Sequence, residues 1–150
     1  MGRRIPCSIG RGGITEDKRE GDWATPAGAH RIVGALWRPD RLVRPCSWAV
    51  PIHPSDLWSD DPKDQDYNHM VQAPYPHSHE ELRRADRLYD MVLVTDWNWP
   101  HAEPGKGSAI FIHCWRSPRR YTAGCVAFDP SDLRWMLRHI RYESRLIVRQ

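Results

Sequence analysis

The stretch from Ser108 to Phe128 constrains the fold of this chain more than any other part of the sequence. It contains an apolar run with His113, a turn-prone loop, and a second apolar run that opens at Gly124 and Cys125. Short apolar runs bounded by turn residues are typical of buried strands. We therefore expect two strands joined by one loop, with an imidazole and a thiol close to its ends.

Cys125 and His113 are the candidates for covalent catalysis. Only a thiolate attacks a carbonyl carbon, and a free cysteine has a pKa of roughly 8.5, so the thiol needs a base. An imidazole with an unperturbed pKa of ~6.5 suits that role, and we expect a backbone carbonyl to hold its tautomer. Gly124 leaves the backbone unshielded, so the N–H groups of Gly124 and Cys125 are candidates for an oxyanion hole. An inert buried thiol and a satisfied core histidine are the alternatives.

Alternation along a strand places Cys114 on the face opposite to His113, so Cys114 is expected to be a core thiol. A metal site built from His113, Cys114 and Cys125 is another alternative. We expect neither a metal nor an organic cofactor. Three other histidines lack the cysteine or carboxylate neighbours typical of zinc sites and are interpreted as solvated loop residues: His69, His77 and His79.

The rest of the sequence predicts a mostly β fold with short helices, in the α+β class. Runs of β-prone residues predict strands over residues 5–9, 30–37, 90–97, 108–115, 125–128 and 145–149. The run 90–97 is apolar almost throughout, which indicates burial on both faces. Gly34 inside the strand 30–37 indicates a bulge or a close backbone approach.

Two short helices are expected. Ser78 followed three residues later by Glu81 is a capping-box pattern, and it predicts a helix over residues 78–88. Asp129 as N-cap and Pro130 at the first helical position predict another. The apolar face of this second helix would consist of Leu133, Met136, Leu137 and Ile140.

Two segments show no clear periodicity. Residues 38–79 are rich in Pro, Asp and His, and so long an irregular stretch either wraps a cleft or contains unrecognised strands. The charged residues 15–22 are interpreted as a solvated surface loop.

At 150 residues, the chain is expected to form a single domain over residues 1–150. Its 22 Lys and Arg and 19 Asp and Glu give a net charge of +3, but the signs are mixed, which argues against a nucleic-acid partner. No apolar run approaches the ~20 residues of a membrane span. No secretory signal is visible at the N-terminus. Four cysteines without CxxC spacing leave the disulfide state of Cys7 and Cys46 open.

His113 and the run Thr122-Ala-Gly-Cys125-Val resemble the signature of the L,D-transpeptidase catalytic domain, or YkuD family: a histidine, a spacer, then Ser or Thr, His, Gly and Cys. The similarity extends along most of the chain and is closest to a short, stand-alone branch of the family. The further matching segments are Glu20–Asp22, Thr25–Gly28, Trp58–Pro62, Tyr67–Asn68, Arg84–Asp86, Leu88–Asp90, Asn98 and Gly107–His113. Their order, more than any single segment, carries the resemblance.

The resemblance implies a β-sandwich or barrel with a Cys-His cleft that acts on peptidoglycan stem peptides. Cys125 would form an acyl-enzyme with a donor stem, and an acceptor amine would resolve it into a crosslink of the 3–3 or 1–3 type. Carbapenem-type β-lactams would acylate the same cysteine. The expected location is the periplasm or cell envelope.

Five further residues are predicted to contact substrate, although each also has a structural interpretation: Tyr67, Asn68, Arg84, Tyr89 and Asn98. An arginine suits a stem carboxylate because the guanidinium binds it bidentately. Three features depart from the family pattern: Ala123 replaces the usual histidine, Ala127 replaces Arg or Asn, and the spacer after His113 is short.

Two other functions are compatible with the same residues. Water could resolve the acyl-enzyme, which would make the protein an L,D-carboxypeptidase, endopeptidase or amidase. A non-catalytic wall-binding module is the alternative from another class.

Overall fold

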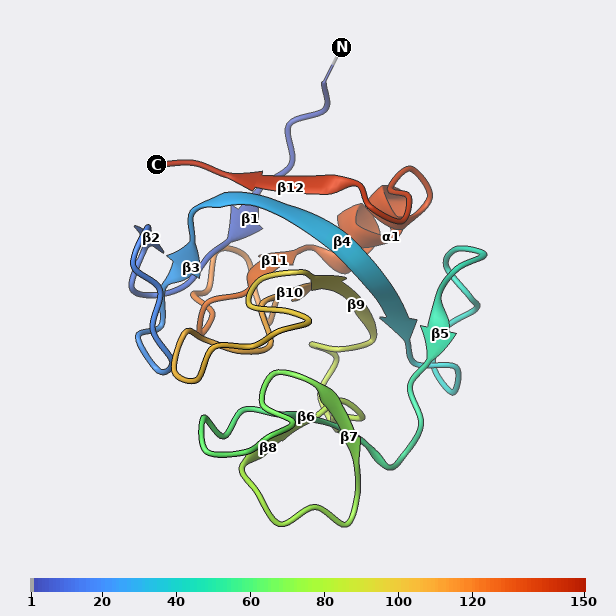
Figure 1. The fold of residues 1–150 in the computed structure, drawn as a ribbon. Helices are drawn as coiled ribbons and strands as arrows, with labels where there is room; N and C mark the ends of the chain where they lie inside the picture. Colours follow the sequence, from blue (N-terminus) through green and yellow to red (C-terminus); the bar gives the residue numbers. More distant parts are fainter. Residues whose placement is uncertain (1) are drawn as a thin grey trace.

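A computed structural model describes residues 2–150, and it is mostly β with one helix, α1 (Pro130–Leu137). The strands are β1 (Cys7–Ser8), β2 (Ile14–Thr15), β3 (Thr25–Pro26), β4 (Gly28–Trp37), β5 (Val50–Pro51), β6 (Asp56–Ser59), β7 (Met70–Gln72), β8 (His79–Glu81), β9 (Met91–Thr95), β10 (Phe111–Cys114), β11 (Val126–Phe128) and β12 (Arg145–Val148). Figure 1 shows β4 arching across the molecule, with β12 beyond it and the sheet of β6, β7 and β8 at the opposite end.

The main sheet has the strand order β1-β11-β10-β9-β4-β12, and β5 pairs with β4. β10 and β11 are parallel, whereas β9 is antiparallel to both of its neighbours. The register of β4 against β9 shifts between Ile32 and Gly34, which confirms the predicted irregularity at Gly34. The parallel pair β10 and β11 is the part of the sheet that positions the site.

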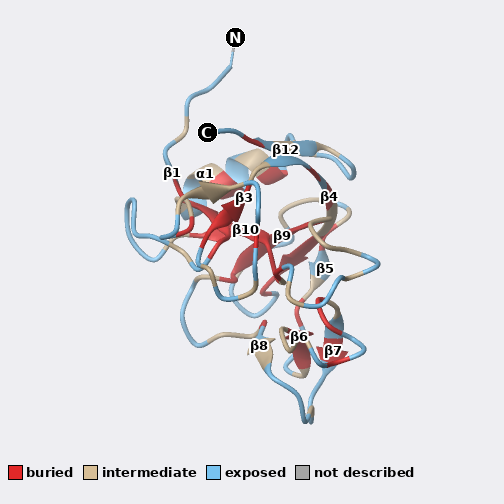
Figure 2. Cartoon of the chain, turned by 60° about the vertical axis from the view of Figure 1, so that its left-hand side comes forward, coloured by how far each residue is buried: buried red, intermediate tan, exposed pale blue. Residues whose placement is uncertain are grey.

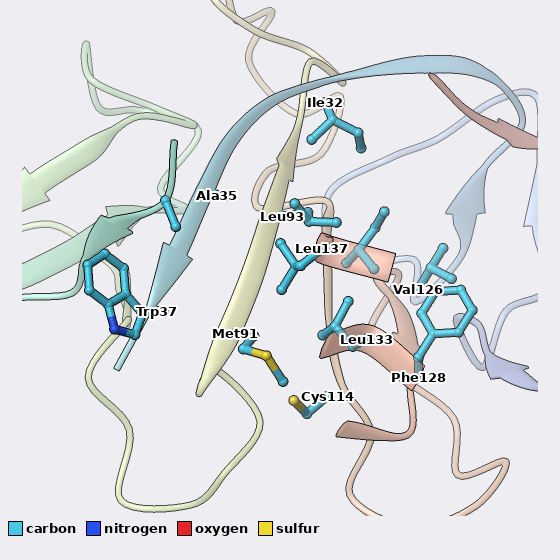
Figure 3. Close-up of a cluster of buried hydrophobic side chains, with 12 residues drawn as sticks. Ile32, Ala35, Trp37, Met91, Leu93, Cys114, Val126, Phe128, Leu133 and Leu137 are labelled. Atoms are coloured by element: carbon cyan, nitrogen blue, oxygen red, sulfur yellow. The ribbon is translucent and has the colours of Figure 1, made fainter. Parts of the chain in front are cut away.

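Both faces of β9 are buried, as its apolar sequence predicts. Met91 and Leu93 belong to one core cluster, which α1 covers (Figure 3). Val92 and Val94 belong to a second cluster with Phe111 on the other face of the sheet. Figure 2 shows buried residues concentrated along the central strands and exposed ones along β12.

Helix α1 forms as predicted. Asp129 accepts a hydrogen bond from the backbone N–H of Ser131, and Pro130 occupies the first turn, where its missing N–H costs nothing. Leu133 and Leu137 are buried against the sheet, and Met136 and Ile140 pack at the edge of the same cluster. No helix in residues 2–150 has the length and apolarity to cross a membrane.

The prediction of a helix over residues 78–88 is wrong. Residues 79–81 form strand β8, which is antiparallel to β6, with Glu80 opposite Trp58. Bends and turns follow β8. Leu82 is fully buried in the second core cluster. Tertiary pairing outweighs a local capping pattern here, because the pattern is worth only about 1 kcal/mol. The irregular segment 38–79 contained unrecognised strands, namely β5, β6 and β7.

Candidate active site

The parallel pairing of β10 and β11 brings the two candidate catalytic residues to one side of the sheet. His113 pairs in register with Ala127, and Cys125 directly precedes β11. Both His113 and Cys125 line a cavity of about 670 Å³. Cys114 faces the other way and is 1% exposed in the core under α1, which confirms the predicted core thiol (Figure 3).

Two contacts determine the orientation of the His113 imidazole. Its Nδ1 lies 2.8 Å from the carbonyl oxygen of Cys114, so Nδ1 donates the proton and Nε2 carries the lone pair. The ring also packs edge-on against Tyr89, with 5.3 Å between centroids. Burial lowers the pKa of His113 to about 4. The ring is therefore a neutral base at neutral pH, held by a backbone carbonyl as expected.

The thiol of Cys125 is also neutral in this structure. Its Sγ donates to the carbonyl oxygen of Ala109 at 3.1 Å and accepts from the N–H of Phe111 at 3.3 Å. Burial, with a smaller contribution from the negative charge of Glu80, raises the pKa of Cys125 to about 12. A thiol and an imidazole in these states exchange a proton only when a bound substrate stabilises the products.

Gly124 is held in a backbone conformation that other residues rarely adopt, with φ of +140°. A Cβ at this position would lie 2.8 Å from the carbonyl oxygen of Ala24. The hydroxyl of Thr25 donates to the carbonyl oxygen of Gly124 at 2.8 Å. The hydroxyl of Thr122 accepts from the Gly124 N–H at 3.1 Å and donates to the Cys125 carbonyl at 2.6 Å. Two threonine hydroxyls therefore fix the turn before the nucleophile.

The hydrogen bond between the Gly124 N–H and Thr122 changes the expected composition of the oxyanion hole. The Gly124 N–H already donates to Thr122, so it is not a free donor. Within residues 2–150, the Cys125 N–H donates no hydrogen bond. Only the N–H of Cys125 therefore remains available from the predicted pair.

Three residues predicted to contact substrate are structural instead. Tyr67 is 2% exposed, donates its hydroxyl to Glu20 and accepts from the N–H of Gly107. Asn68, also 2% exposed, accepts from the indole of Trp58 and the N–H of Ala109 and donates to the carbonyls of residues 97 and 98.

Asn98 holds its own loop and does not line the cavity of Cys125. Its side-chain amide donates to the carbonyls of Glu103 and Gly107, and its oxygen accepts from the N–H of Glu103. The backbone here has φ of +50°, which asparagine tolerates better than most residues. The Asn68 and Asn98 side chains thus shape the segment that leads to β10.

Arg84 and Tyr89 do line the cavity with Cys125 and His113. The Arg84 guanidinium binds Asp86 bidentately, at 2.8 and 2.7 Å, and lies 5.3 Å from the centroid of the Tyr89 ring. The Tyr89 hydroxyl donates to Oε2 of Glu80 at 2.5 Å. Arg84 is therefore not free to bind a substrate carboxylate unless Asp86 shares it.

Residues that the sequence did not single out complete the cavity. Trp23, which is 52% exposed, lines it from the N-terminal part of the chain, and Glu80 lines it from β8. Arg116 and Arg120 line it from the loop between β10 and β11. The segment 15–22 is more than a solvated loop, because Lys18 within it is 4% exposed.

Histidine clusters do not form a metal site in the part of the chain described. Residues 2–150 contain no group of three or more His, Cys, Asp and Glu side chains that could hold a metal ion. His69 and His79 instead direct Nδ1 at nearby carbonyls, and His77 lies 3.5 Å from Asp61.

The fold and the site together define a mostly β protein in which a buried thiol and a neutral imidazole share one cavity. A family model described as YkuD, L,D-transpeptidase catalytic domain, matches residues 2–148. The chain belongs to this family, whose members are cysteine-dependent enzymes of peptidoglycan and are typically associated with the cell envelope. Comparison with curated proteins and with solved structures gives no match.

Proposed function

We propose that this protein is a peptidoglycan L,D-transpeptidase that forms stem-peptide crosslinks through an acyl-enzyme on Cys125, with His113 as the base. The shared cavity of Cys125 and His113, beside the free N–H of Cys125, is the observation that carries the proposal. A nucleophile, a base and a donor for the oxyanion are the three groups that acyl transfer requires.

The protonation states favour a coupled first step. Sγ of Cys125 attacks the carbonyl carbon of the donor stem while Nε2 of His113 takes the thiol proton. The Nδ1 proton stays on His113 throughout and is donated to the carbonyl oxygen of Cys114. The N–H of Cys125 stabilises the oxyanion, and removal of such a donor typically costs about 10²–10³ in rate. The imidazolium then protonates the leaving amine of the terminal D-residue, and the thioester forms.

The cavity also suits the charge of the donor. Arg116 and Arg120 are exposed side chains on its wall, and stem peptides carry carboxylates. Arg120 has no ion pair in residues 2–150, whereas Arg116 lies 3.8 Å from Asp86. We therefore assign stem-carboxylate binding to Arg116 and Arg120 and not to Arg84, which Asp86 already binds.

Mass spectrometry of products from defined stem peptides tests the proposal. Crosslinked dimers, with loss of all product in Cys125→Ala and retention in Cys114→Ala, would support it. Trimmed monomers alone would instead indicate the hydrolase, for which the cavity of about 670 Å³ has room for a water molecule beside the thioester. Unchanged biological effect of Cys125→Ala would indicate a wall-binding module. Meropenem should add to Cys125 and not to Cys114.

A further inference from the structure

A second cavity, of about 200 Å³, adjoins the first at the nucleophile. Four residues line both cavities: Trp23, Glu80, Ala123 and Cys125. The thiol of Cys125 can therefore be approached from two directions. A transfer reaction needs two such approaches, because donor and acceptor must both reach the same sulfur-bound carbonyl carbon.

The balance of charge differs between the two cavities, because the first is lined by three arginines and by only two carboxylates, those of Glu80 and Glu81. Three arginines face only the first cavity, whereas the second is lined by the carboxylates of Glu20, Asp60 and Glu80. The one lysine in the second cavity, Lys18, has Nζ within 2.5 Å of Asp22 and 2.7 Å of the Arg19 carbonyl, so its charge is already paired. The second cavity therefore favours a cation.

Two carboxylate oxygens at the second cavity lack a hydrogen-bond donor in the described part of the chain. Oδ1 of Asp60 is buried and has no hydrogen-bond partner within residues 2–150. Oε2 of Glu80 accepts from the Tyr89 hydroxyl, whereas Oε1 accepts no hydrogen bond from residues 2–150. A buried acceptor without a donor is unfavourable, and an ammonium group offers three donors together with the opposite charge. A primary ammonium is thus the ligand that these two oxygens lack.

We propose that the second cavity binds the protonated primary amine of the acceptor stem, and that Glu80 takes a proton from it as its nitrogen attacks the Cys125 thioester. This inference rests on the function proposed above. The C–N bond forms and the C–S bond breaks. Of the two protons that the ammonium loses, one goes to the Glu80 carboxylate and the other to the departing Cys125 sulfur, so charge and atoms balance.

The surroundings of Glu80 suit a proton acceptor. Burial raises its pKa, Tyr89 and Arg84 oppose this effect, and Asp60 and Glu20 add to it. His79 and Glu81 on the same strand, together with Lys18 and Cys125, also face the two cavities. A carboxylate with a raised pKa is a stronger base, and general-base assistance typically contributes about 10²–10⁴ in rate.

The test separates amine binding from acylation and uses n-butylamine as the probe amine. The acyl-enzyme is formed from a donor tetrapeptide, and the ratio of butylamide to free acid is measured by mass spectrometry. Asp60→Asn and Glu80→Gln should lower this ratio by about 10- to 100-fold, more than they lower the rate of Cys125 acylation. Asp61→Asn, which lies next to Asp60 but lines neither cavity, should change neither quantity.

Two further measurements exclude a merely structural effect. The wild-type ratio should rise with pH through the raised pKa of Glu80, and this rise should be absent in Glu80→Gln. Protein NMR should detect binding of n-butylammonium, and not of n-butanol, to Cys125→Ala protein, with Asp60→Asn weakening it by about tenfold or more.

The outcomes distinguish this inference from the proposed function. If stem peptides never acylate Cys125 while n-butylammonium binds in an Asp60-dependent way, the transpeptidase proposal fails and the cation site stands. If Cys125 is acylated but neither variant alters the ratio, or if butanol and butylammonium bind equally, the inference is overturned.

Discussion

Replacement of Gly124 by alanine tests whether the turn before Cys125 is as tightly constrained as its contacts indicate. The φ angle of Gly124 is +140°, and an added Cβ would lie 2.8 Å from the carbonyl oxygen of Ala24. Relief of this overlap would shift Gly124 away from Thr25, whose hydroxyl donates to its carbonyl at 2.8 Å. The same shift would move the N–H of Cys125.

Two costs set the size of the effect. A residue with a side chain in such a backbone conformation costs about 1–3 kcal/mol. Overlap with a neighbouring backbone atom adds about 1–3 kcal/mol. Alanine also restricts the unfolded chain, which offsets about 0.4–1 kcal/mol. We expect Gly124→Ala to lower the free energy of unfolding by about 2–5 kcal/mol, and the melting temperature by about 5–15 °C.

Gly105→Ala is the matched control. Gly105 also has a positive φ, of +81°, but a Cβ there would meet nothing within 4 Å. Gly105→Ala should lower the free energy of unfolding by about 1 kcal/mol, from backbone strain alone. Urea denaturation of both variants measures the difference, and acylation of Cys125 reports on the site. Equal stability of the two variants, or normal acylation by Gly124→Ala, would refute the constraint.

Three titrating groups should give measurable pH effects. Burial lowers the pKa of His113 from 6.5 to about 4, so native stability should fall as pH drops through this range, and His113→Gln should remove about 3 kcal/mol of that dependence in urea titrations. Arg38 lowers the pKa of Asp40 from 3.8 to about 2. The stabilisation from this pair is therefore complete above pH 3.8 and is lost as pH falls through 2. Asp40→Asn should make the melting temperature less dependent on pH between these values. Because burial raises the pKa of Cys125 to about 12, iodoacetamide at pH 7 should label exposed Cys7 about tenfold faster or more, and equal labelling of the two peptides would contradict a neutral thiol.

Most of the main sheet could be predicted because its strands are locally distinctive. β4, β9 and β10 are apolar and rich in β-prone residues, and α1 begins at an aspartate followed by proline. β8 could not be predicted in the same way, because its partner β6 lies about twenty residues earlier in a segment rich in Pro and Asp. Its strand character depends on a pairing that the local sequence does not encode.

The site residues also differ in how far the local sequence predicts their roles. Cys125 and His113 lie at strand ends whose alternation indicates which side they face. Asn68 and Asn98 lie in loops, where a polar side chain that binds backbone has the same sequence signature as one that binds a ligand. Glu80 could not be identified from the sequence because the capping-box pattern around it predicts a short helix over residues 78–88, whereas these residues include strand β8.

Ala123 connects the departures from the family pattern with the arrangement of the site. This methyl group lines both cavities beside Cys125, at the position where the family pattern has a histidine. A histidine ring at this position would fill more of the space beside Cys125 than the methyl group of Ala123 does. The hydroxyls of Thr25 and Thr122 hold the turn through main-chain atoms, so the turn needs no side chain at position 123. Alanine at position 123 is therefore compatible with a nucleophile whose turn is held by main-chain contacts alone.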